Sequence, residues 1–486
     1  MIVKASVWSI AGSVIEKVLM LATYVIVTRQ VDKVQFGLLV LVLLFTELLA
    51  YIAGMGISEN IIRTKTLSDD FMTSNKRFNR LVAAGLTGVM LLLLTPAAYY
   101  FHSAELAKLT LIMAFYPALP ALASFYMAIM RRDMRFKELA IRTALISLLS
   151  GLTGILLALA GAGVYALIAA KYAYSFADWW ILKKLTKFIS VGKVDRQHLR
   201  ETWDMGWKLS SAQVFNYSSS RVYELFITTL FGPVYLAVLD VGRKFITTFF
   251  RMSLTPLNNV ALPYLSRAKD PIAAYLAFVR VIAALVVPVA AIMGGLSVPL
   301  TLVFFGEKWA ESAVVGQIIS FGVVVQVLTW HLNSLMVKYG KSGLVLNLQI
   351  TAFVVLVVFG AIGALAKLPF HEFVALLVAG TFVAAFIRVT ALKFFMGFPL
   401  PKFCLAFLET LLIFGFNFLV SAYLWKLIVV QVSVDRLGYF INGILQLILC
   451  SLFTLVLYLP YLVYLYRRYR NNPNPSDSVP NQSKSF

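Results

Sequence analysis

Apolar runs of about 20 residues recur from one end of this chain to the other, and each could cross a bilayer as a helix. The runs show no ten-residue alternation, so helices are predicted rather than the strands of a barrel. We expect about fourteen spans, near 6–28, 36–57, 81–100, 108–129, 139–160, 163–182, 208–230, 233–259, 275–304, 313–337, 343–366, 372–392, 403–425 and 438–466. The sequence thus predicts an all-α integral membrane protein.

Composition agrees with this class. Hydrophobic residues make up 60% of the 486 residues and charged residues 13%, whereas soluble domains carry about 45–50% and about 25%. A soluble multidomain enzyme, a disulfide-rich secreted scaffold and a disordered chain are therefore excluded.

The positions of the basic residues predict the orientation in the membrane. With a cytoplasmic N-terminus, the loops on that side hold about 27 Lys and Arg and the opposite loops about 7. Such a bias favours the cytoplasmic side for the richer loops, and an even number of spans then makes both termini cytoplasmic. The net charge of +21 follows from orientation and contact with anionic lipid, so a nucleic-acid partner is not expected.

A polar connection divides the spans into groups. We predict an N-terminal six-helix lobe, a cytoplasmic linker, a second six-helix lobe, two additional helices and a disordered cytoplasmic tail, over residues 1–184, 185–207, 208–395, 396–466 and 467–486. A weak internal repeat, offset by about 200 residues, supports the two lobes. Gly161-Ala162 and Phe231-Gly232-Pro233 leave room only for tight hairpins between spans.

Ionisable residues inside the spans are the candidate site, because each costs about 2.5–3.5 kcal/mol at a helix centre and so needs a partner or a water-filled cavity. Six are cations and three are acids, and the excess of positive charge suits an anionic ligand. The cations are Lys17, Lys171, Arg221, Arg243, Lys244 and Arg251, and the charge-balancing or ion-coupling acids are Glu16, Glu224 and Asp240.

Spacing leaves a second interpretation open. Arg221 and Glu224, like Asp240 and Arg243, are three residues apart and can form local ion pairs that only neutralise each other. Arg142, Arg280 and Arg388 lie near the ends of spans, where long side chains reach the interface, and we do not count them as site residues.

No residue pattern predicts an enzyme. The four His residues are scattered, no Walker A motif occurs, and no Ser/His/Asp set stands out, so we expect no metal, no nucleotide and no catalytic residues. Cys404 and Cys450 lie inside apolar runs and are interpreted as buried thiols.

Five short segments resemble the polysaccharide-transporter family, the Wzx-type oligosaccharide flippases of the MOP/MATE-like flippase superfamily. They are QFGL after the first span, MRRDMRF after the fourth, GAGVYAL opening the sixth, LPYLSR closing the eighth and FFGEKWA after the ninth, at residues 35–38, 130–136, 161–167, 262–267 and 304–310. Their order and spacing together make the resemblance fairly specific. Many relatives have an Asp at the position of Tyr223, so ion-coupling details are not transferred.

The resemblance implies two six-helix lobes in a V around a central cavity, plus two C-terminal helices, in the bacterial inner membrane. It implies a flippase that exports a polyprenyl-pyrophosphate-linked oligosaccharide repeat unit by alternating access. We expect no bound cofactor, and a proton or a sodium gradient stays open as the energy source. Membrane lipid and a polysaccharide polymerase or other assembly proteins are the implied partners. The alternatives are an ion-coupled small-molecule or drug antiporter of the same fold and a membrane-embedded polysaccharide polymerase. Short non-cytoplasmic loops disfavour the polymerase.

Overall fold

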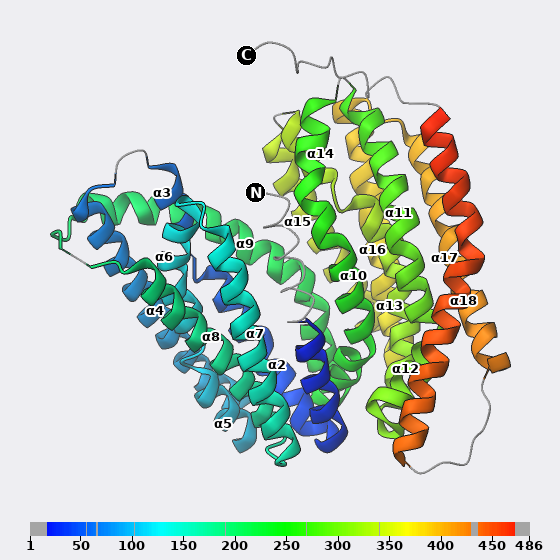
Figure 1. Ribbon diagram of the computed structural model, residues 1–486, viewed down its shortest axis with the longest axis horizontal. Coiled ribbons are helices and arrows are strands. Elements are labelled where there is room, and N and C mark those ends of the chain that lie inside the picture. The colour runs from blue at the N-terminus through cyan, green and yellow to red at the C-terminus, as the bar shows by residue number, and fades with distance from the viewer. Residues whose placement is uncertain are drawn as a thin grey trace. The chain divides into compact units, whose positions relative to one another are not determined.

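The computed structural model describes residues 17–471, with gaps at 55, 65–66, 102, 190, 269, 340 and 429–435. The described residues form helices joined by short turns, without a strand (Figure 1). Contacts divide the chain into two compact units, Met1–Ala237 and Val238–Phe486. Each unit is described separately below.

The N-terminal unit is a bundle of long and short helices. A helix through residues 17–30 precedes α2 (Lys33–Ile52), α3 (Ile57–Arg63), α4 (Asp69–Phe101), α5 (Ala104–Met113), α6 (Ala118–Arg132), α7 (Phe136–Leu159), α8 (Val164–Thr186) and α9 (Arg196–Phe231). Helix α6 packs against both α4 and α8, α7 packs along α8, and α2 contacts α5 and α9. These contacts bring segments far apart in sequence, such as α2 and α9, side by side.

Local sequence sets the ends of these helices. Asp32 caps α2, since its carboxylate accepts hydrogen bonds from the backbone N–H of Val34 at 2.6 Å and of Gln35 at 3.3 Å. Gly161 and Gly232 adopt φ of 81° and 85°, values that suit glycine, and they turn the chain between α7 and α8 and between α9 and α10. The tight hairpin predicted at Gly161-Ala162 is confirmed, since α7 and α8 pack along each other, and the connection at Gly232 is as short as predicted.

Gly37 allows a close approach inside the N-terminal unit. A Cβ atom built on Gly37 would lie 1.9 Å from the carbonyl oxygen of Pro233, so no side chain fits at this place. Pro233 is the first residue of α10 (Pro233–Arg267), where a missing N–H costs no helical hydrogen bond. Residues 35–38, which the sequence placed after the first span, are already part of α2.

The C-terminal unit continues from α10. Its elements are α11 (Pro271–Gly295), α12 (Ser297–Leu300), a π-helical turn η1 (Thr301–Phe305), a 3₁₀ turn η2 (Glu307–Trp309), α13 (Ala310–Thr329), α14 (Leu332–Lys338), α15 (Ser342–Leu365), α16 (Phe370–Met396), α17 (Leu400–Ile428) and α18 (Arg436–Asn471). Helix α11 packs against α13 and α17, and α17 packs against α18 (Figure 1).

Buried side chains of α11 form the centre of this unit. Val286 and Val287 pack with Val324 of α13 and Phe414 of α17 in one apolar cluster, and all four are buried. Tyr458 of α18 joins the cluster, and its hydroxyl donates a hydrogen bond to the carbonyl of Ala284 at 3.2 Å. Burial of these side chains fixes how the helices of this unit pack.

The prediction of an all-α membrane protein is confirmed. Nine helices of the described residues are long and apolar enough to cross a membrane, and α4, α9 and α10 are also long, with 33, 36 and 35 residues. The count of fourteen stays a prediction. The domain boundaries also stay predictions, although packing divides the chain after Ala237 rather than at 185–207.

Three details differ from the sequence-based expectation. The expected linker is half helical, because α9 already begins at Arg196. The expected tail begins too early, because α18 continues to Asn471, whereas residues 472–486 lie outside the described residues. Cys404 is exposed on α17, so the interpretation as two buried thiols is wrong for this residue and holds for Cys450.

Candidate functional site: an ion-pair network in the N-terminal unit

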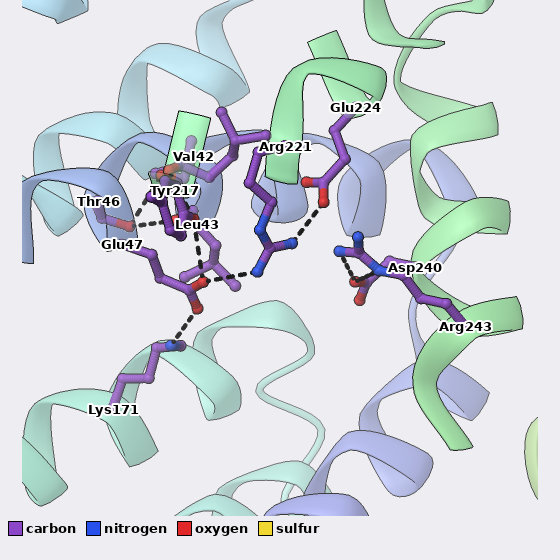
Figure 2. A network of polar contacts seen from close by, with 11 residues as sticks. Val42, Leu43, Thr46, Glu47, Lys171, Tyr217, Arg221, Glu224, Asp240 and Arg243 are labelled. Atoms are coloured by element: carbon purple, nitrogen blue, oxygen red, sulfur yellow. Dashed lines mark hydrogen bonds and ion pairs between the residues drawn. The ribbon is translucent and has the colours of Figure 1, made fainter. Parts of the chain in front are cut away.

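Glu47 is the centre of a polar network and follows the long apolar run of α2. Its neighbours along the chain are Leu43, Leu44, Phe45, Thr46 and Leu48. The hydroxyl of Thr46 is satisfied locally, since it donates to the carbonyls of Val42 at 3.0 Å and Leu43 at 3.1 Å. The Glu47 carboxylate instead reaches side chains on α8 and α9 (Figure 2).

Lys171 of α8 is the first partner. Its Nζ lies 3.2 Å from Oε1 of Glu47, and the two side chains are 17% and 34% exposed. The ammonium group also lies over the ring of Tyr116, 5.6 Å from its centroid. A carboxylate and an aromatic face together stabilise a cation that is largely removed from solvent.

Arg221 of α9 is the second partner and carries two contacts. Its Nη2 lies 3.4 Å from Oε2 of Glu47, while its Nη1 lies 2.5 Å from Oε1 of Glu224. The Glu224 side chain is 1% exposed. The shorter contact to the more deeply buried acid holds the guanidinium in place, and the contact to Glu47 is longer and more accessible.

Tyr217 closes the network from the preceding turn of α9. Its hydroxyl lies 3.3 Å from the carbonyl oxygen of Leu44 and 3.4 Å from Oε2 of Glu47. The guanidinium of Arg221 lies 5.3 Å from the centroid of the Tyr217 ring. The four-residue offset puts Tyr217 and Arg221 on one face of α9, which is the face that turns toward α2.

The network balances two cations against two carboxylates. Lys171 and Arg221 are neutralised by Glu47 and Glu224, which the low dielectric of the surroundings demands. The structure therefore brings three predicted site residues together, Lys171, Arg221 and Glu224. It adds Glu47, which lowers the predicted excess of intramembrane cations from three to two.

The sequence contained the signal for Glu47. This acid lies at the middle of the predicted span 36–57, the depth at which a lone carboxylate is most costly. The list of candidate acids omitted it, and the omission is an error that the contacts with Lys171 and Arg221 correct.

Asp240 and Arg243 form a separate pair in the C-terminal unit. Nη2 of Arg243 lies 2.8 Å from Oδ1 of Asp240, and the side chains are 10% and 13% exposed. The local ion pair, one of the two interpretations of this spacing, is observed here and at Arg221–Glu224. On the same helix Lys244 is half-buried and Arg251 is exposed.

The remaining predicted residues belong to the beginning of the chain. Lys17 is half-buried in the first described helix. Glu16 lies outside the described residues. No group of three His, Cys, Asp or Glu that could hold a metal ion occurs in the described part of the chain.

Two arginines that we had placed at the membrane interface form ion pairs with acids on neighbouring helices. Nη1 of Arg142 on α7 lies 2.6 Å from Oδ1 of Asp178 on α8, and the side chains are 7% and 16% exposed. Nε of Arg280 on α11 lies 3.0 Å from Oε2 of Glu409 on α17. These pairs join neighbouring helices within each unit, and the burial of Arg142 indicates a structural role.

The family model described as "Polysaccharide biosynthesis protein" matches residues 26–314, which is more than half of the chain. The search of curated proteins gave no match.

Solved structures share the fold. The lipid II flippase MurJ in an inward closed conformation has a TM-score of 0.68 at 13% identity, over 93% of this chain and 99% of MurJ. An inward-facing multidrug resistance MATE family transporter of the MOP superfamily has a TM-score of 0.59 at 14% identity, over 82% and 95%. A MOP superfamily transporter from Pyrococcus furiosus has a TM-score of 0.55 at 16% identity, over 85% and 96%. At these identities the likeness is one of fold.

Proposed function

The chain belongs to the family of polysaccharide biosynthesis proteins, and from this premise we propose that it is a flippase for a polyprenyl-pyrophosphate-linked oligosaccharide. It is a multi-pass membrane protein with the fold of flippases and transporters. The proposed cargo is the repeat unit of an O-antigen, capsule or exopolysaccharide. We propose that transport occurs by alternating access, that a proton or sodium gradient supplies the energy, and that no catalytic step is involved.

The Glu47–Lys171–Arg221 arrangement is the observation that carries the proposal. Two cations from different helices share one carboxylate inside the N-terminal bundle. A pyrophosphate offers several anionic oxygens, so it can replace Glu47 as the shared partner of Lys171 and Arg221. Glu224 stays paired with Nη1 of Arg221 and keeps the guanidinium oriented during this exchange.

Pyrophosphate can displace a carboxylate from Arg221 only if that carboxylate is accessible and its contact with the guanidinium is not too short. Glu47 meets both conditions better than Glu224, because it is 34% exposed against 1% and its contact with Arg221 is 3.4 Å against 2.5 Å. We therefore assign Glu47 as the charge-balancing residue of the unloaded site and Glu224 as a positioning residue. The other predicted cavity cations, Lys17, Arg243, Lys244 and Arg251, stay predictions.

The test is translocation in proteoliposomes that contain a fluorescent polyprenyl-pyrophosphate oligosaccharide. An external sugar-modifying enzyme reports how much of the lipid has crossed. Lys171→Gln and Arg221→Gln should each lower the rate at least tenfold at matched protein level. Lys393→Gln, at an exposed position on α16, removes the same charge and should keep the wild-type rate. Crossing that is unchanged in both site variants contradicts the assignment of these cations.

A cation antiporter is the second candidate, and the accessible carboxylate of Glu47 favours it. A partly exposed carboxylate that pairs with two cations can exchange one of those cations for a cationic substrate. Two results together would favour the antiporter over the flippase. The same proteoliposomes would take up cationic dyes, with uptake lost in Glu47→Gln, and lipid-linked sugars would not cross under either a proton or a sodium gradient. A polysaccharide polymerase has no comparable supporting observation.

The proposal also sets the cellular context. We place the protein in a bacterial inner membrane with both termini in the cytoplasm, as the distribution of basic residues predicts. A polymerase that consumes the exported repeat unit is the proposed functional partner. Labelling of single cysteines introduced into α2–α3 and α8–α9 connections in whole cells would test this orientation.

A further inference from the structure

A cavity lies within the N-terminal unit, and none of the residues of the ion-pair network lines it. It has a volume of about 680 Å³ and opens between α4, α6 and α8. Its lining residues are Lys76, Asn79, Arg80, Ala83, Ala84, Thr87, Phe115, Ala118, Leu122, Tyr126, Trp179 and Lys183. The volume is within the range of about 300–1,000 Å³ that is usual for small-molecule sites.

One end of the cavity is cationic. Lys76 and Arg80 lie near the beginning of α4, and Lys183 lies near the end of α8. The ammonium of Lys76 lies 5.0 Å from the ring centroid of Phe188, just beyond α8, which places the start of α4 beside the end of α8. The ammonium of Lys183 lies 5.3 Å from the ring centroid of Trp179. None of the lining residues is acidic, so this end carries a net positive charge.

The other end is apolar. Along α4 the lining continues from Arg80 through Ala83 and Ala84 to Thr87, a face that extends about 16 Å from Lys76 at 1.5 Å per residue. Opposite it lie small and apolar side chains, among them Phe115 and Leu122. The third predicted span begins at residue 81, so the charged end lies just outside the predicted apolar layer and the apolar end within it.

This polarity matches that of an anionic phospholipid. A phosphate group at the charged end would contact the three cations, and an acyl chain would cover the apolar face of α4. An inorganic phosphate would use only the charged end, and a zwitterionic lipid would bring its own cation against Lys76 and Arg80. We propose that the cavity between α4, α6 and α8 binds an anionic membrane phospholipid, held at its phosphate by Lys76, Arg80 and Lys183.

This proposal is independent of the cargo. The Glu47 network is formed by α2, α8 and α9, whereas the cationic end of the cavity is formed by the start of α4 and the end of α8. A lipid bound here connects three helices of one unit, so its binding should raise the thermal stability of the protein without any substrate present.

The test uses the purified full-length protein and native mass spectrometry, with phosphatidylglycerol and phosphatidylcholine as probes. Wild type should retain phosphatidylglycerol at least fivefold more than phosphatidylcholine. The variant Lys76→Gln/Arg80→Gln/Lys183→Gln should lose this preference. The control Arg77→Gln/Lys137→Gln/Lys184→Gln removes three positive charges at exposed positions outside the cavity and should keep it.

A second variant tests the apolar end with the charges intact. Ala84→Phe adds a large ring to the apolar lining of the cavity. It should reduce retention of phosphatidylglycerol severalfold, while the circular dichroism spectrum stays that of wild type. Equal retention by the cavity variant and the control would overturn the proposal. Displacement of the lipid by millimolar inorganic phosphate would also overturn it, because the site would then recognise the soluble anion.

Discussion

Glu47 and Lys171 meet across 124 residues of sequence, with Oε1 and Nζ 3.2 Å apart. The contact joins α2 to α8, and Arg221 extends it to α9. Three helices of the N-terminal unit are thus connected by one carboxylate. Glu47 therefore has both a structural role and a proposed functional role, and the two roles can be measured separately.

Glu47→Gln should destabilise the N-terminal unit. The substitution leaves Lys171 and Arg221 with one carboxylate between them, and breaking a buried pair costs about 3–5 kcal/mol. We expect a loss of about 1–3 kcal/mol in the free energy of unfolding, because the Glu47 side chain is 34% exposed and its charge is partly screened. Chemical unfolding in mixed micelles measures the free energy. Glu372→Gln, at an exposed position of α16, is the control and should change it by less than about 0.5 kcal/mol.

Gly37→Ala should impair folding more than any conservative surface change. The new Cβ would lie 1.9 Å from the carbonyl oxygen of Pro233, so the backbone of α2 or the start of α10 must move. Overpacking of this kind costs about 1–3 kcal/mol or more, and a lower yield of monodisperse protein in detergent should report it.

Gly85→Ala is the matched control for Gly37→Ala. Gly85 is a helical residue of α4, and apart from its chain neighbours and the backbone of its own helix no atom lies within 4 Å of a Cβ built on it. The substitution should therefore be neutral or stabilise by about 0.4–1 kcal/mol. Equal yields of the Gly37→Ala and Gly85→Ala proteins would contradict the close approach of α2 to Pro233.

The Arg142–Asp178 pair should behave as a structural pair. Arg142→Met alone leaves the carboxylate of Asp178 without its partner 2.6 Å away and should lower the unfolding free energy by about 3 kcal/mol. The double variant Arg142→Met/Asp178→Leu should recover most of that loss, because an apolar pair needs no compensation. A double-mutant cycle that shows no coupling between α7 and α8 would exclude this contact.

The two thiols should differ in reactivity. Cys404 is exposed on α17, whereas Cys450 is buried in α18 with none of its surface exposed. N-ethylmaleimide should therefore modify Cys404 of the folded protein at least tenfold faster than Cys450. Cys404→Ser should abolish the fast reaction and Cys450→Ser should leave it intact, as intact-mass measurements over time would show.

Much of the fold could be predicted from local pattern. The short turns at Gly161 and Gly232 follow from residues that permit positive φ, and the helical class follows from apolar runs that must satisfy their own backbone in lipid. The Arg221–Glu224 and Asp240–Arg243 pairs follow from a spacing of three within one helix. Each of these features depends on residues that are neighbours in sequence.

The candidate site could not be predicted in this way, because its residues are neighbours in space and not in sequence. Glu47 is one acid in an apolar helix, and only the packing of α2 beside α8 and α9 shows that it serves Lys171 and Arg221 at once. Arg142 is a second example. Its position near the end of a span predicted an interfacial side chain, and only the packing of α7 along α8 shows that it pairs with Asp178. The sequence by itself determined the membrane class, the short turns and the local ion pairs, because these rest on solvation and helical spacing. Only the tertiary structure decided which charges share a partner, because that choice depends on which helix faces meet.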